Sequence, residues 1–92
     1  MKTIQINKFY IIEDCEIQSG DNIIAEDFDY TSSLKDAKQF DSYDSAKALI
    51  NEICEYYNAQ VRDAFEINVG GEIRHIYGED LKEFLIDLSY EI

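Results

Sequence analysis

The sequence predicts an α+β domain: a four-stranded, mainly antiparallel sheet with two helices packed on one face. Strand-like segments rich in Ile, Phe and Tyr occur in two pairs, and each pair is joined by a turn that contains glycine. A segment with apolar residues at helical spacing follows each pair, so the expected order is β-β-α-β-β-α. The 92 residues are enough for one hydrophobic core, and we therefore treat residues 1–92 as a single compact domain.

The first strand is expected over residues 2–14, where Ile4 and Ile6 alternate with polar residues. The alternation blurs at residues 9–12, "FYII", which indicates either a β-bulge or burial on both faces. The cluster "QSGDN" at residues 18–22 predicts a turn.

A second strand is expected to pair back on the first, from Ile23 to about Tyr30. Residues 31–40, "TSSLKDAKQF", leave two alternatives open. They form either a helical turn or a connection that buries Leu34, Ala37 and Phe40.

The first helix is the clearest element and is expected over residues 42–57 of "FDSYDSAKALINEICEYYN", with Asn58 as its C-terminal stop. Asp41 or Ser42 can cap its N-terminus, and Asp44 in the first turn suits the helix dipole. Its apolar side is formed by Ala46, Leu49, Ile50, Ile53, Cys54 and Tyr57.

Residues 61–77, "VRDAFEINVGGEIRHIY", predict a β-hairpin. A two-residue loop, Gly70-Gly71, would set Ile67 opposite Arg74 and so mix apolar and charged side chains on one face. A three-residue loop, residues 69–71, avoids this mixing and is the expected one. It places Phe65, Ile67, Ile73 and His75 on one face, and on the other it sets Glu66 opposite Arg74.

The second helix is expected in "GEDLKEFLIDLSYEI", residues 78–92. Glu79 and Asp80 suit its N-terminus because carboxylates there complement the helix dipole. The apolar side is formed by Leu81, Phe84, Leu85, Leu88 and Ile92. The opposite side carries Glu83, Asp87 and Glu91.

The net charge of −12 comes from 20 acidic and 8 basic residues. Nucleic acids and anionic membranes repel such a chain, so we expect neither as a direct ligand. A basic protein surface is the expected partner. The alternative is that the negative charge serves only to keep the protein soluble.

Residues with catalytic or metal-binding chemistry are few. Cys15 and Cys54 lie far apart in the sequence and are expected to be free thiols, and a single histidine, His75, is too few to complete a zinc set. His75 is expected to be a satisfied core or edge residue. No nucleophile–base set can be assembled, so we expect a non-catalytic protein without a metal or cofactor.

The most acidic stretch is "EDCEIQSGDNIIAEDFDY", residues 13–30, which contains seven carboxylates and no lysine or arginine. Its spacing fails the calcium-loop pattern because Gly20 precedes the acids instead of dividing them. We expect it to bind a partner through charge, with the aromatics as anchors. The expected partner-binding residues are Asp14, Glu16, Asp21, Glu26, Asp27, Phe28, Asp29 and Tyr30.

The stretch "LKDAKQFDSYDSAKALINEI", residues 34–53, together with the acidic "AEDFDY" before it, resembles small phage-borne inhibitors of the anti-CRISPR type. These inhibitors have no common fold or residue signature, so the resemblance carries over no functional residue. It implies stoichiometric binding to the basic nucleic-acid-binding or target-recognition surface of a CRISPR effector nuclease, which the acids would meet as a nucleic-acid mimic.

The N-terminus lacks the features of a secretory signal, and no apolar stretch is long enough to span a bilayer. We therefore expect a cytoplasmic protein, and the resemblance to phage-borne inhibitors implies a bacterial host cell. The alternative function is a non-catalytic structural or protein-interaction module. The oligomeric state stays open between monomer and homodimer.

Overall fold

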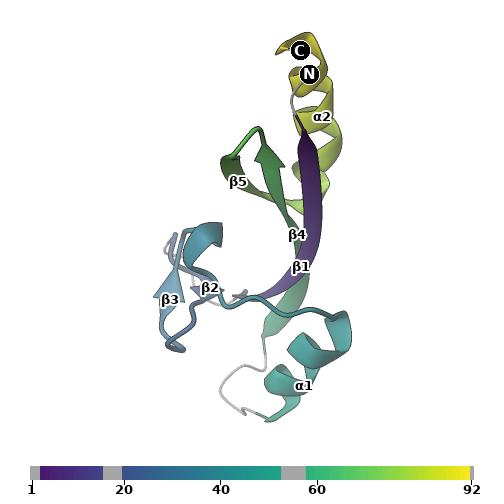
Figure 1. The fold of residues 1–92 in the computed structure, drawn as a ribbon. Helices are drawn as coiled ribbons and strands as arrows, with labels where there is room; N and C mark the ends of the chain where they lie inside the picture. Colours follow the sequence, from purple (N-terminus) through teal and green to yellow (C-terminus); the bar gives the residue numbers. More distant parts are fainter. Residues whose placement is uncertain (1–2, 16–19, 53–57, 92) are drawn as a thin grey trace.

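The computed structural model describes residues 3–15, 20–52 and 58–91 of the chain. It confirms the α+β class: the described residues form one antiparallel sheet of five strands, in the order β3-β2-β1-β4-β5, and two α-helices (Figure 1). The elements are β1 (Ile4–Asp14), β2 (Ile23–Ile24), β3 (Tyr30–Thr31), the 3-10 turn η1 (Leu34–Asp36), α1 (Tyr43–Glu52), β4 (Ala59–Val69), β5 (Glu72–Tyr77), the 3-10 turn η3 (Gly78–Asp80) and α2 (Leu81–Glu91).

The centre of the sheet is the pairing of β1 with β4, each 11 residues long. Their register runs without interruption from Ile4 opposite Val69 to Asp14 opposite Ala59. No residue is skipped, so the blurred alternation at residues 9–12 does not come from a bulge. It comes from burial on both faces, because Ile11 and Ile12 are both fully buried although they point to opposite sides of the strand.

Each face of the β1–β4 pair therefore has its own core. One face is covered by the η1 segment, and its core consists of Phe9, Ile11, Ile23, Leu34, Ala37 and Ala64. The other face is covered by α1, and its core consists of Ile12, Ile24, Ala46 and Ile50. Residues 31–40 thus combine the two alternatives, since η1 is a helical turn and the same segment buries Leu34 and Ala37.

The molecule is elongated, with extents of 48 × 25 × 21 Å. Its radius of gyration, 14.5 Å, exceeds the ~12 Å typical of a chain of this length. Figure 1 shows why: α1 and α2 lie at opposite ends of the long β1–β4 pair, and α2 lies at the end where β1 begins. On α2, Leu88 is buried, whereas Leu85 and Ile86 are exposed.

The hairpin between β4 and β5 has the two-residue loop, so the expected three-residue loop was wrong. Val69 is opposite Glu72, and Ile67 is opposite Arg74. Gly70 and Gly71 both have positive φ, 58° and 94°. Two successive positive φ values define the turn that matches the twist of a hairpin, and glycine adopts them without strain. This turn geometry outweighed the mixing of apolar and charged residues on one face.

The other corrections concern element boundaries. Residues 23–30 were expected to form one strand, but they form two short strands, β2 and β3, with a tight turn between them. The sheet consequently has one strand more than expected. The first helix is described from Tyr43 to Glu52, and the predicted apolar positions Ile53, Cys54 and Tyr57 lie outside the described residues. No helix among the described residues is long and apolar enough to cross a membrane.

We expect Ile11→Val and Ile12→Val each to lower the free energy of unfolding by about 0.5–1.5 kcal/mol, because each removes a methylene from a filled core. Ile73→Val, at an isoleucine that is 54% exposed, is the control and should change it by less than about 0.5 kcal/mol. Chemical denaturation measures all three. A sheet with a single core would instead make one of the two neighbouring variants nearly neutral.

Candidate partner-binding site

The turn between β2 and β3 holds Phe28 in a strained conformation. The Phe28 N–H donates to the Ala25 carbonyl (3.0 Å), and the Ala25 N–H donates to the Asp29 carbonyl (2.8 Å). Phe28 itself has φ of 66° and is the one non-glycine residue with positive φ in the described part of the chain. This is the left-handed position of a three-residue hairpin loop, where glycine or asparagine is usual. A phenylalanine there costs roughly 1–2 kcal/mol.

Phe28 is 49% exposed and lies among three exposed acidic residues, Glu26, Asp27 and Asp29. We call residues 26–29 the acidic tip. Asp27 Oδ1 accepts the Asp29 N–H (3.1 Å), and Asp29 Oδ1 accepts the Tyr30 N–H (2.9 Å). These bonds fix the directions of both carboxylates and satisfy backbone groups of the turn. The tip therefore presents charge and an aromatic ring on a backbone that these hydrogen bonds hold in one conformation.

Lys38 is the basic residue at the acidic tip. Its Nζ lies 3.8 Å from Glu26 Oε2 and 5.5 Å from the centre of the Phe28 ring. Sequence reasoning missed this residue because it follows Phe28 by ten positions, beyond the range of any local spacing rule. Lys38 offsets one of the three carboxylates, so Asp27 and Asp29 carry the net negative charge of the tip.

Not all of the expected partner-binding residues belong to this surface. Asp14 is 7% exposed, and its Oδ2 accepts the Tyr30 hydroxyl (3.0 Å). The expectation that Asp14 faces a partner was therefore wrong, and Tyr30 ties the turn to β1 while its ring packs on the core under α1. Asp21 is exposed but precedes β2, whereas the tip follows β2. Glu16 lies outside the described residues.

The remaining acids are spread along the molecule. Asp44 and Glu52 are exposed on α1, and Glu83 and Asp87 are exposed on α2, at the opposite end (Figure 1). Over its 48 Å length, duplex DNA would carry about 28 phosphates. The net charge of −12 is less than half of that. Binding at one acidic site with an aromatic anchor is therefore favoured over mimicry along the whole length.

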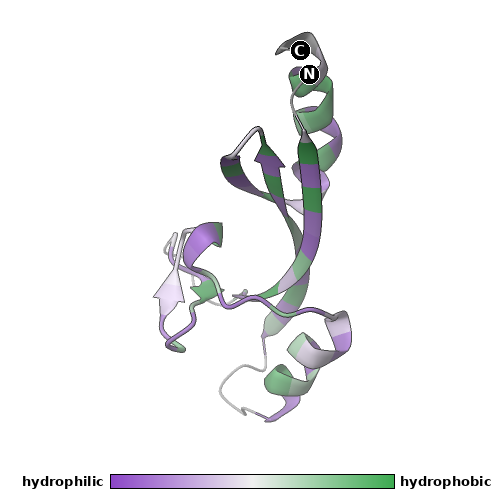
Figure 2. Ribbon diagram, viewed as in Figure 1, coloured by the Kyte–Doolittle hydropathy of each residue, from purple (hydrophilic) through white to green (hydrophobic). Residues whose placement is uncertain are grey.

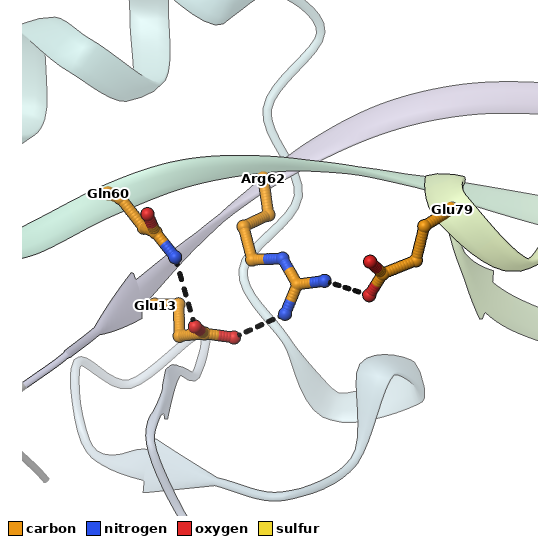
Figure 3. A network of polar contacts seen from close by, with 4 residues as sticks. All are labelled: Glu13, Gln60, Arg62 and Glu79. Carbon is orange, nitrogen blue, oxygen red and sulfur yellow. Dashed lines mark hydrogen bonds and ion pairs between the residues drawn. The ribbon is translucent and has the colours of Figure 1, made fainter.

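Arg62 is the centre of a polar network away from the tip, where it neutralises acids (Figure 3). Its Nη1 donates to Glu13 Oε2 (2.8 Å), its Nη2 donates to Glu79, and its guanidinium lies 4.2 Å from the centre of the Tyr77 ring. Gln60 donates to the other oxygen of Glu13 (3.2 Å). Sequence reasoning gave no sign of this set, because Glu13 and Arg62 are neighbours only through the β1–β4 register.

The charge of Arg62 is secured by its partners. Burial acts to lower the pKa of Arg62, but the hydrogen bonds and charges of Glu13 and Glu79 outweigh burial and raise it above its ordinary value. Burial, with the charge of Glu13 next in size, raises the pKa of Tyr77. Glu13 and Glu79 are thus both paired with Arg62 of the same chain. This leaves the acidic tip as the better candidate for an external partner.

No other cluster in the described residues offers an alternative site. No group of three or more His, Cys, Asp or Glu there is placed to hold a metal ion. A shallow hollow lined by Thr3, Gln5, Asn68, Gly70 and Gly71 carries no titratable side chain. His75 is half-buried against the Phe9 ring, and its Nε2 lies 3.2 Å from Glu66 Oε1, so it is a satisfied edge histidine as expected.

No protein-family model matches this chain, and comparison with the curated proteins and with the solved structures finds no match.

We expect Phe28→Gly to be more stable than Phe28→Ala by about 1 kcal/mol, because both variants lose the ring but glycine alone relieves the positive φ. The control is the exposed helical residue Lys47, where alanine should be more stable than glycine by about 1 kcal/mol. Chemical denaturation of the four variants measures both differences. Equal stability of the two Phe28 variants would contradict the strained conformation.

We expect Tyr30→Phe to lower the free energy of unfolding by about 1.5–3 kcal/mol, since it removes a hydrogen bond to the buried carboxylate of Asp14. Tyr43→Phe, at an exposed tyrosine on α1, is the matched control and should be nearly neutral. Thermal melting of both variants provides the comparison. Equal melting temperatures would mean that the hydroxyl does not hold the turn.

Proposed function

We propose that this chain is a non-catalytic acidic inhibitor that binds the basic nucleic-acid-binding or target-recognition surface of a nuclease. The observation that carries the proposal is the conformation of Phe28 on the acidic tip. A strained, half-exposed aromatic lowers the stability of the fold. Such strain persists where the geometry serves recognition or chemistry. Apart from its carboxylates, the tip carries no side chain that could act as a nucleophile or a general base.

The chemistry of the tip defines the partner. Asp27 and Asp29 suit the forked guanidinium of arginine, and the Phe28 ring suits stacking by the same group. Surfaces rich in arginine are the ones that hold nucleic acid and read short duplex motifs in RNA-guided nucleases. The resemblance to anti-CRISPR inhibitors points to a CRISPR effector nuclease as the particular partner.

The charge of the whole chain supports the same class of partner. With a net charge of −12, long-range attraction speeds encounter with a basic surface and suppresses encounter with acidic ones. Affinity then depends on close contacts at the tip, since exposed charges farther away contribute little.

We expect Phe28→Gly to weaken binding to the nuclease by about 30-fold or more, the effect of losing an anchor residue at an interface. Tyr43→Ala removes another exposed aromatic, on α1, and should leave affinity nearly unchanged. The partner can be captured from bacterial host lysate on the immobilised chain, and the affinities of the variants then follow by calorimetry. Equal losses for the two variants would overturn the tip as the binding site.

We expect Asp27→Asn with Asp29→Asn to weaken the same interaction by about 3- to 30-fold and to reduce its salt dependence. Asparagine keeps an oxygen that can accept the backbone N–H, so the turn stays intact while its charge is lost. The matched control is Asp63→Asn with Glu72→Gln, which removes the same charge from exposed residues of β4 and β5, away from the tip. Cleavage by the captured nuclease, titrated with each variant at low and high salt, gives the comparison. Inhibition that does not change with salt would overturn a charge-driven mechanism.

A further inference from the structure

The outer edge of β1 lacks a neighbouring strand over part of its length. Phe40 bonds to Tyr10 through both backbone groups (2.9 Å each), and β2 pairs with β1 at Glu13. From Ile4 to Phe9, no strand of the described residues pairs with that edge. Backbone groups alternate in direction along a strand. Because those of Tyr10 point outward, the N–H and C=O groups of Lys8, Ile6 and Ile4 also point outward.

The same stretch is an apolar edge without acids. Ile4 is 37% exposed and Ile6 is 42% exposed, and in Figure 2 this part of β1 shows alternating hydrophobic and hydrophilic bands. The first carboxylate in the sequence is Glu13, although the chain carries 20 acidic residues. Proteins usually protect a sheet edge by a charge, a proline or a bulge. Lys8 is the one such device between Ile4 and Phe9.

We propose that a second copy of this chain pairs with the Ile4–Lys8 edge of β1, antiparallel and about a two-fold axis at Ile6. With Ile6 opposite Ile6 of the second copy, Ile4 falls opposite Lys8, so every outward backbone group finds a partner. Sliding the register in one direction runs into Phe40, which already occupies Tyr10. Shifting the register in the other direction leaves Lys8 of one copy without a partner among Ile4, Ile6 and Lys8 of the other copy.

The side chains fit the same register. Ile4, Ile6 and Lys8 lie on one face of the strand, where Ile6 would pack on its counterpart and the Lys8 stem would cover Ile4. Gln5 would face Asn7 on the other face, as two amides able to hydrogen-bond. No like charges meet directly.

Charge favours this edge over the rest of the surface as the contact between two copies of the chain. Two copies, each with a charge of −12, repel one another. They approach with less repulsion along a strand that carries no acids before Glu13 than at the acidic tip, although α2, with its exposed Glu83 and Asp87, lies at the same end of the molecule. The interface is separate from the acidic tip, so the inference goes beyond the proposed function and does not depend on it.

The first test is the mass of the chain in solution, by light scattering and sedimentation, over a range of concentrations and salt. We expect a monomer–dimer equilibrium that salt strengthens, because it screens the repulsion. Nuclease binding should respond to salt in the opposite sense, so the two proposals can fail separately. A monomeric mass at millimolar concentration in high salt would overturn the dimer.

The second test uses Ile6→Lys, which sets two lysines face to face at the two-fold axis and should weaken dimerisation at least about tenfold. Ile73→Lys changes an exposed isoleucine on β5, the other edge strand, and is the matched control. Equal effects of the two variants would place the interface elsewhere.

Hydrogen exchange of the unmodified chain supplies a readout that no folding defect can disturb. The amides of Gln5 and Asn7 point toward β4 and should be protected at every concentration. Those of Ile4, Ile6 and Lys8 should become protected as the chain dimerises. Uniform exchange of the second group at all concentrations would contradict strand pairing at this edge.

Discussion

The pairing of β1 with β4 is the constraint on which the rest of the structure depends. Two 11-residue strands paired without a bulge form a ribbon about 35 Å long, which is stable in water only if other elements cover its apolar side chains. The sequence places apolar residues on both sides of β1 at residues 9–12. Both faces therefore need cover at this end, and a chain of this length supplies it with η1 on one side and α1 on the other.

This constraint also decides where the charges lie. Of the eight basic residues, Arg62 is held over Tyr77 between Glu13 and Glu79, and Arg74 pairs with Glu72. The Arg74–Glu72 pair is exposed and contributes little stability, whereas the Arg62–Glu13 pair is partly buried. Both arginines also change the distribution of charge, because they neutralise acids on β1, β5 and η3. On the turn between β2 and β3, Lys38 pairs with Glu26, and Asp27 and Asp29 keep their charge, as do the exposed acids of α1 and α2.

The sequence predicted those features that depend on periodicity and failed on those that depend on single backbone conformations. The two helices and the long first strand follow from repeated apolar spacing, which many residues determine together. The Gly70-Gly71 turn was mistaken because side-chain matching was weighted above the twist that two positive φ values impose. The turn at residues 26–29 was missed because phenylalanine at a left-handed position follows no composition rule. Asp14 was misplaced for another reason: its partner, Tyr30, is brought to it by tertiary packing alone.

The acidic tip and the open edge are attached to different parts of the same strand, so they act independently. β2 joins β1 at Glu13, while the open edge ends at Lys8, and five residues of extended strand separate these points by about 17 Å. This exceeds the screening length of about 8 Å at physiological ionic strength and the range over which substitutions usually couple. A charge removed at the tip thus leaves the edge unchanged, and a lysine placed at Ile6 leaves the tip unchanged. The long β1–β4 ribbon keeps the acidic tip and the open edge of β1 apart on a chain of 92 residues.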